Sequence, residues 1–125
     1  MLFRSVGVMN AGPFSARLLT NAPLPAWLKE PENVKAAARA AAAHCASKGV
    51  DIAKLALQFC IQHPDIATTV PGTANPDNMA KMLKWIDEPV DWELIGEVQK
   101  VLEPTKNILW PVGRPENSED LNAGL

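Results

Sequence analysis

The sequence is poor in cysteine, in charge of one sign and in long apolar runs, and each shortage excludes a class of protein. Two cysteines in 125 residues are too few for a disulfide scaffold. A net charge of −2, from 12 basic and 14 acidic residues in interspersed order, argues against a nucleic acid held on a basic surface. No apolar run approaches the roughly 18 residues of a membrane span, and the N-terminus lacks the pattern of a secretory leader.

The two cysteines also indicate a compartment. Cys45 and Cys60 fall on apolar faces of predicted helices, where free, buried thiols are favoured over a metal or redox site. We therefore expect a protein of a reducing, cytoplasmic compartment, with no nucleic acid, membrane or metal as partner. His44 and His63 lack metal-ligand spacing and a catalytic triad, so both are expected at the surface or at helix ends.

A hydrophobic content of 47% is enough for one domain with a core. Short apolar segments closed by turn residues predict strands at 6–10 and 66–70. Start and stop signals predict four helices. The first begins at Pro31-Glu32 and ends at Gly49, and the second covers 52–62 and follows the cap Asp51. The third begins at Pro76 after the cap Asn75, and the fourth begins at 92 after the cap Asp91. Residues 15–31 are expected to be a loop, and residues 113–125 a polar, disordered tail.

Helical periodicity predicts which faces are buried. Three stripes are expected to face a core, namely Val34, Ala38, Ala41 and Cys45; Met79, Met82, Leu83 and Ile86; and Leu94, Ile95, Val98, Val101 and Leu102. The helix over 52–62 has one polar stripe, formed by Lys54, Gln58 and Gln62, and its remaining apolar surface, including Phe59, predicts burial on more than one side. Packing roles are also expected for Trp27, Trp85 and Trp92.

The alternation of strands and helices predicts an α/β fold with parallel strands joined by crossovers. Two parallel strands do not make a complete sheet, because both outer edges would carry unpaired backbone groups. A self-sufficient domain of this class needs more strands than the sequence provides.

The turn after the second strand is the most informative stretch. Thr68-Thr69-Val70 runs through Pro71-Gly72 into a helix capped by Asn75. The free N–H groups and positive dipole end of such a helix suit a phosphate. The alternative is a plain turn, in which Thr73 and Asn75 serve only to begin the helix.

Four motifs in unbroken order over about residues 6–112 resemble the aldo-keto reductase family. Val8-Met9-Asn10-Ala11-Gly12-Pro13-Phe14, followed by Leu18-Leu19-Thr20, resembles the motif of its seventh strand, and Val70-Pro71-Gly72-Thr73 resembles that of its eighth. Leu55-Ala56-Leu57-Gln58-Phe59 matches the helix between them. Leu102-Glu103-Pro104-Thr105-Lys106-Asn107 with Trp110-Pro111 resembles the tail of the branch that contains L-galactose and L-fucose dehydrogenases.

The resemblance implies a (β/α)8 TIM barrel, of which residues 1–112 would be the C-terminal portion with strands seven and eight, incomplete as an isolated chain. Residues 1–5 do not fit the family and are expected to be non-native. The acid–base tyrosine and its partners come from the first four strands of the family's barrel, and this sequence has no tyrosine. No catalytic residue is therefore assigned to it.

The resemblance also implies a nicotinamide cofactor at the C-terminal ends of the strands. The residues expected to contact it are Ala11, Gly12, Pro13, Phe14, Pro71, Gly72, Thr73, Asn75, Asn78 and Lys81. Arg17 is expected to face solvent, with a cofactor contact as the alternative, and Trp110 is expected to contact substrate. Gly72 and Asn78 stand where many members carry a basic residue for the 2′-phosphate, so NAD is favoured over NADP unless Lys81 supplies the charge.

The leading hypothesis is a C-terminal fragment of an NAD(P)-dependent oxidoreductase that acts on an aldose-like sugar. Such a fragment is expected to be inactive alone and to self-associate. The alternative is a non-catalytic α/β module, either a piece of a pseudoenzyme or an assembly partner. A small helical binding domain would leave the two strand ends unexplained.

Overall fold

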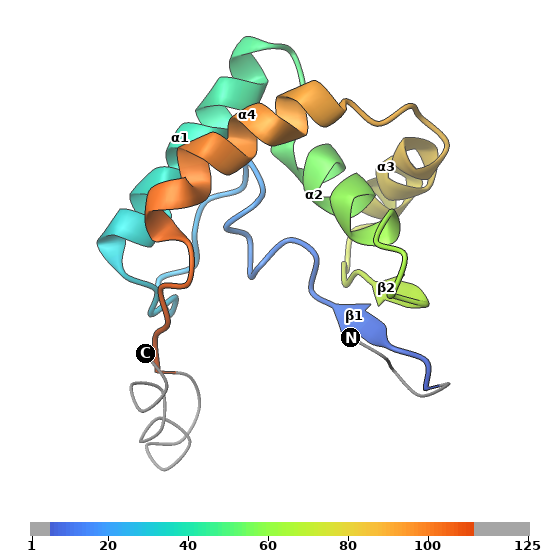
Figure 1. Cartoon of the computed structure of the whole chain (residues 1–125), viewed down its shortest axis with the longest axis horizontal. Coiled ribbons are helices and arrows are strands. Elements are labelled where there is room, and N and C mark those ends of the chain that lie inside the picture. The colour runs from blue at the N-terminus through green and yellow to red at the C-terminus, as the bar shows by residue number, and fades with distance from the viewer. Residues whose placement is uncertain (1–5, 112–125) are drawn as a thin grey trace.

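The computed structural model describes residues 6–111, which form two short strands and four α-helices (Figure 1). In chain order the elements are β1 (Met9–Ala11), α1 (Glu32–Ser47), α2 (Ile52–Ile61), β2 (Thr68–Val70), α3 (Pro76–Ile86), α4 (Trp92–Leu102) and the 3-10 helix η1 (Glu103–Thr105). The predicted order of strands and helices is confirmed. The expectations for residues 1–5 and 113–125 lie outside the described residues.

Side-chain caps determine where three of the helices begin. Asp51, Asn75 and Asp91 each accept a hydrogen bond of 2.9 Å from a backbone N–H in the first turn of α2, α3 and α4. A cap of this kind stabilises a helix by about 1 kcal/mol. α1 starts behind Pro31 without a side-chain cap, and it ends before Gly49, whose φ of +71° suits glycine.

β1 and β2 pair in parallel, as predicted, with Met9 opposite Thr68 and Ala11 opposite Val70. Both strands are shorter than the predicted ranges 6–10 and 66–70. The ladder ends on one side at Gly12, where a φ of +67° turns the chain away. On the other side, the last contact is the hydrogen bond from the Ala67 amide to the Val8 carbonyl, 2.9 Å long.

The two faces of this strand pair have different surroundings. α2 lies over one face, where Asn10 is paired with Thr69 and lies beside the thiol of Cys60 (Figure 1). On the opposite face, Met9 and Val70 are 73% and 52% exposed. Parallel sheets in proteins are covered on both faces. We call the face that contains Met9, Ala11, Thr68 and Val70 the bare face.

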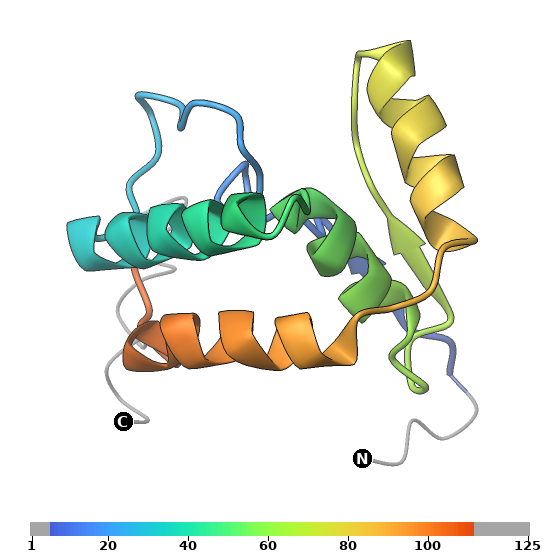
Figure 2. The ribbon, with the colours of Figure 1, turned by 90° about the horizontal axis from the view of Figure 1, so that it is seen from above.

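The main core is built by helices and contains no strand residue. α1 and α4 lie side by side in opposite directions, next to α2 (Figures 1 and 2). The buried cluster consists of Ala41, Cys45, Ile52, Leu55, Leu94, Ile95 and Val98. Each buried leucine, isoleucine or valine contributes about 1.5–3 kcal/mol. The inward stripes predicted for α1 and α4 are therefore confirmed.

The stripe predicted on α3 does not face a core. Met82 is 3% exposed, but Leu83 is 59% exposed, and Met79 and Ile86 are exposed as well. Periodicity identified the apolar face of α3 correctly, but it carries no information on what covers that face. Among the described residues, Met82 is covered, and Met79, Leu83 and Ile86 stay exposed.

Aromatic residues show the same difference between expectation and structure. Trp85 is partly buried, whereas Trp27 and Trp92 are largely exposed, so the packing role predicted for those two is wrong. Phe59 is also exposed, and α2 is therefore less enclosed than its composition suggests. Gln58, placed on the polar stripe of α2, is in contrast fully buried.

A polar cluster joins the outer sides of α1 and α4. The carboxylate of Glu97 lies 2.6 Å from Nε2 of His44 and 3.1 Å from Nζ of Lys48. The hydrogen bonds from His44 and Lys48 hold the pKa of Glu97 below its usual value of 4.5. All three side chains are partly exposed, so water screens their interaction.

We predict that acid weakens the α1–α4 contact through Glu97. A carboxylate with a lowered pKa in the folded state adds stability above its unfolded value, and that stability is lost as the pH falls through the folded value. Glu97→Gln should therefore lower the thermal midpoint at neutral pH and flatten its decline below pH 4.5. Circular dichroism melts test this, with Glu103→Gln, at an exposed position, as control. Equal acid slopes in variant and parent would contradict the assignment.

We also predict that the chain self-associates. The bare face and the exposed side of α3 present apolar surface, and both strands have an open edge. Leu83→Lys should raise the monomer fraction measured by size-exclusion chromatography with light scattering. Gln99→Lys adds the same charge at an exposed position of α4 and should change nothing. A parent chain that stays monomeric at every concentration would show that these surfaces do not drive association.

Candidate functional site

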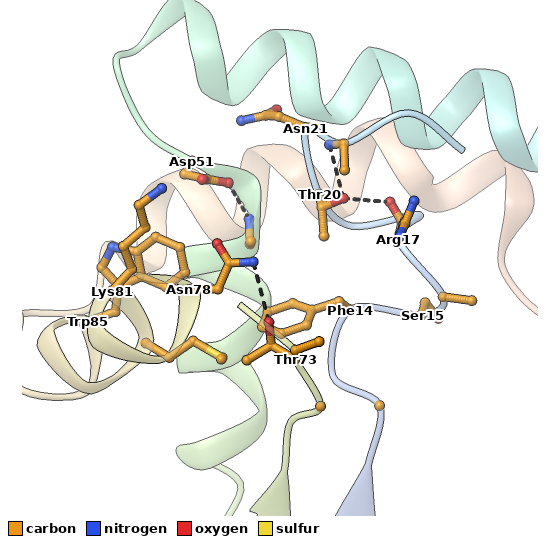
Figure 3. Close-up of a pocket in the computed structure, with 17 residues that line it drawn as sticks. Phe14, Ser15, Arg17, Thr20, Asn21, Asp51, Thr73, Asn78, Lys81 and Trp85 are labelled. Atoms are coloured by element: carbon orange, nitrogen blue, oxygen red, sulfur yellow. Dashed lines mark hydrogen bonds between the residues drawn. The ribbon is translucent and has the colours of Figure 1, made fainter. Parts of the chain in front are cut away.

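An open cavity of about 630 Å³ lies at the carboxyl ends of β1 and β2 (Figure 3). Its walls come from the loop after β1, the start of α2, the turn after β2 and one face of α3. The lining residues are Gly12, Phe14, Ser15, Ala16, Arg17, Thr20, Asn21, Ala22, Asp51, Ala53, Gly72, Thr73, Ala74, Asn78, Lys81, Met82 and Trp85. Ligands of folds with parallel strands bind at this end of the sheet.

The loop after β1 holds an unusual backbone conformation. Ser15, Ala16 and Arg17 have φ values of +49°, +51° and +76°. The left-handed region costs a non-glycine residue roughly 1–2 kcal/mol, and such residues concentrate at functional sites. The loop is held by the hydrogen bond from the Leu19 amide to the Phe14 carbonyl, 3.1 Å long, and by the buried side chain of Leu18.

The turn after β2 uses its polar side chains to begin α3. Oγ1 of Thr73 accepts hydrogen bonds from the Asn75 amide at 3.1 Å and from Nδ2 of Asn78 at 3.4 Å. Asn75 in turn caps α3 through the amide of Asp77. The expected role of Thr73 and Asn75 in beginning the helix is therefore confirmed. The amides of residues 72–74 donate no hydrogen bond within the described part of the chain, so they stay available to a ligand.

The charges at the cavity favour an anion. Arg17 and Lys81 line it, and neither forms a salt bridge with another residue in the range 6–111. The carboxylate of Asp51 lies at the wall but is engaged by the Ala53 amide. Figure 3 shows Lys81 and Trp85 on one side of the cavity and Ser15 and Arg17 on the other.

The structure brings together part of the predicted contact set. Of those residues, the cavity is lined by Gly12, Phe14, Gly72, Thr73, Asn78 and Lys81. Ala11 lies on the bare face of β1, Pro13 is buried, Pro71 is partly buried, and Asn75 serves as the cap of α3. Trp110 lies beyond η1, partly buried, and is not among the lining residues.

Other lining residues were missed, although local patterns pointed to some of them. Trp85 follows Asn78 and Lys81 at the spacing that places residues on one helix face. Asp51 was recognised as a cap, but its place at the cavity follows from the packing of α2 beside the strands. Thr20 belongs to the motif that follows the first strand, although no contact was assigned to it, and no local pattern marks Asn21.

Metal and membrane features are not found in the part of the chain that the structure describes. Residues 6–111 contain no group of three or more His, Cys, Asp or Glu side chains that could hold a metal. No helix within the same range has both the length and the apolar character to cross a bilayer. Cys45 and Cys60 are free, and burial raises the pKa of both thiols.

Residues 3–103 match the model of the aldo/keto reductase family, a range that includes both strands, the cavity and α1 to α4. The chain belongs to the aldo/keto reductase family. It is 36% identical over 118 residues to the L-galactose dehydrogenase of Arabidopsis thaliana. That alignment covers 91% of this chain and 37% of the relative, so the chain spans little more than a third of the relative's length.

This assignment gives the cavity a chemical context. Aldo-keto reductases are oxidoreductases built on a (β/α)8 barrel, and they generally use NAD(P)H. The resemblance to the sugar-dehydrogenase branch is confirmed by the plant relative. The two parallel strands and four helices observed here are consistent with part of such a barrel.

Proposed function

We propose that the chain is the part of an aldo-keto reductase barrel that carries its seventh and eighth strands and one portion of the nicotinamide cofactor site. The observation that carries this proposal is the cavity at the carboxyl ends of β1 and β2, inside the region matched by the family. In the complete enzyme, the reaction is hydride transfer between the cofactor and an aldose-like sugar.

The barrel part of the proposal is supported by what the chain leaves uncovered. Two parallel strands with two open edges and an apolar bare face need further strands on both sides. Closure of a barrel removes the open strand edges and covers the bare face with the side chains that fill the interior. The exposed stripe of α3 is the surface that neighbouring elements of a barrel would cover.

The donors at the cavity fit a dinucleotide. The open amides of residues 72–74 and the start of α3 offer hydrogen bonds and a positive dipole end to a pyrophosphate. Arg17 and Lys81 add two cations without protein partners among the described residues. When bound, a nicotinamide supplies the hydride acceptor or donor. This chain's residues would hold and orient its adenosine side.

The proposal for the substrate rests on the plant relative, whose name states that it acts on L-galactose. An aldose-like sugar is therefore the substrate class we propose for the complete enzyme. Trp110 stays a predicted substrate contact, to be tested in the closed barrel.

A non-catalytic role is the second candidate, and the composition supports it. The sequence has no tyrosine, the residue type that serves as acid–base catalyst in the family. The chain could therefore complete a barrel without contributing to its chemistry. The parallel strand pair and the family match disfavour a small helical binding domain.

We predict that the 125-residue chain alone does not oxidise L-galactose, L-fucose or D-arabinose. General acid–base catalysis contributes roughly 10²–10⁴-fold, and no tyrosine is present to provide it. A chimaera in which this chain replaces the matched segment of the Arabidopsis relative should regain NAD(P)H formation. Turnover by the isolated chain would contradict the fragment proposal, and a folded chimaera that binds cofactor without turnover would favour the non-catalytic module.

We predict that the same chimaera prefers NAD to NADP. The position of Gly72 and that of Asn78 offer no cation to a 2′-phosphate, and a missing charge-assisted hydrogen bond costs ~1.5–3 kcal/mol, or about 10–150-fold in affinity. Fluorescence titration of both cofactors measures the ratio. Lys81→Ala tests whether that side chain supplies the charge, with Lys84→Ala, outside the cavity, as the matched control. Tighter NADP binding that is lost in Lys81→Ala would reverse the preference.

A further inference from the structure

Gln58 is a fully buried polar side chain on α2, and it contacts one carbonyl in the last turn of α3 and one just after that helix. Its Nε2 donates hydrogen bonds to the backbone carbonyls of Trp85, at 2.9 Å, and of Glu88, at 3.1 Å. Because both neighbours are acceptors, the orientation of the carboxamide is fixed by this network. Its Oε1 is buried without a partner among the described residues.

These two bonds tie the last turn of α3 and the segment just after it to α2. The last carbonyls of a helix have no partners within the helix, and a side chain from a neighbouring element can supply them. A buried acceptor left unpaired is unfavourable, so a fully apolar side chain would suit the position of Gln58 better if packing alone mattered. The nitrogen's two bonds, one to the last turn of α3 and one to Glu88 after it, account for a carboxamide at this position.

Few other contacts hold α3 in place. Met82 is its one buried residue, and the rest of its apolar stripe is exposed. The ion pair between Lys54, one turn before Gln58 on α2, and Glu88 adds a second polar tie at the same end of α3. The bond from Lys54 lowers the pKa of Glu88, which keeps this carboxylate charged.

The opposite wall of the cavity is held separately. Leu18 anchors the loop after β1 on α1, in a buried cluster with Leu28 and Ala38 that contains no residue of α3. Asn78, Lys81 and Trp85 therefore depend on the position of α3, whereas Phe14 and Arg17 depend on the loop. A shift of α3 would open one wall and leave the other in place.

We propose that Gln58 is a positioning residue, which holds α3 so that Asn78, Lys81 and Trp85 face the adenosine side of a bound dinucleotide. This inference rests on the proposed function, because it assigns α3 to the adenosine side. Gln58 itself does not line the cavity. It acts through the carbonyl of Trp85, in the last turn of α3, and that of Glu88, just beyond the helix.

The test uses Gln58→Met, which keeps the length of the side chain and removes both donors, and Gln58→Glu, which places a carboxylate against two carbonyl oxygens. Hydrogen exchange should accelerate in α3 by about tenfold, and the amides of α1 and α4 should be unaffected. The dissociation constant of ADP should rise about tenfold, which corresponds to 1.4 kcal/mol. Binding of nicotinamide mononucleotide should not change, and Gln58→Glu should show the larger effects.

Gln62→Met is the matched control, because Gln62 is exposed at the end of the same helix. Circular dichroism verifies that each variant is folded. Unchanged α3 exchange and ADP affinity in both Gln58 variants would overturn the inference. Equal weakening of both nucleotides, with faster exchange in every helix, would also overturn it, since that pattern indicates general destabilisation. A parent chain that binds neither nucleotide would overturn the proposed function, while faster exchange confined to α3 would still support the tie from Gln58.

Discussion

The bare face of the β1–β2 pair is the constraint on which the other features of this chain depend. Main-chain pairing holds two parallel strands together, but it cannot shield Met9 and Val70 from water. α2 covers the other face, and within residues 6–111 no element covers the bare face. The ladder is correspondingly short, and the open cavity lies at the carboxyl ends of the same two strands.

The helical side of the molecule, unlike the strand pair, buries its own apolar residues. α1, α2 and α4 bury their own apolar stripes against one another, with Cys45, Ile52 and Leu94 among the buried residues. The cavity lies between these helices and the incomplete sheet. The wall formed by the loop after β1 is anchored on α1, and the other wall depends on the position of α3.

Local chemistry explains why much of this fold could be predicted. A cap such as Asp51 or Asn75 acts within one turn, so its effect is visible in the sequence. The turn that follows β2 was recognised for the same reason, and it lies at the cavity. Burial is different, because it depends on neighbours. Leu83 belongs to an apolar stripe and Trp92 was expected to pack, yet both are exposed, because no described element lies over them.

Gln58 shows how a polar residue can be misjudged by periodicity and still carry information. The stripe of Lys54, Gln58 and Gln62 was expected to be the polar side of α2, and its first two members in fact contact the end of α3 and the segment just after it. Three polar residues on one side of a helix are compatible with solvent or with the backbone of another helix end. The structure distinguishes these cases, since the carboxamide is buried and donates to the backbone carbonyls of Trp85 and Glu88. In this chain, therefore, the polar stripe of α2 is the link between the self-contained helical core and the helix that lines the cavity.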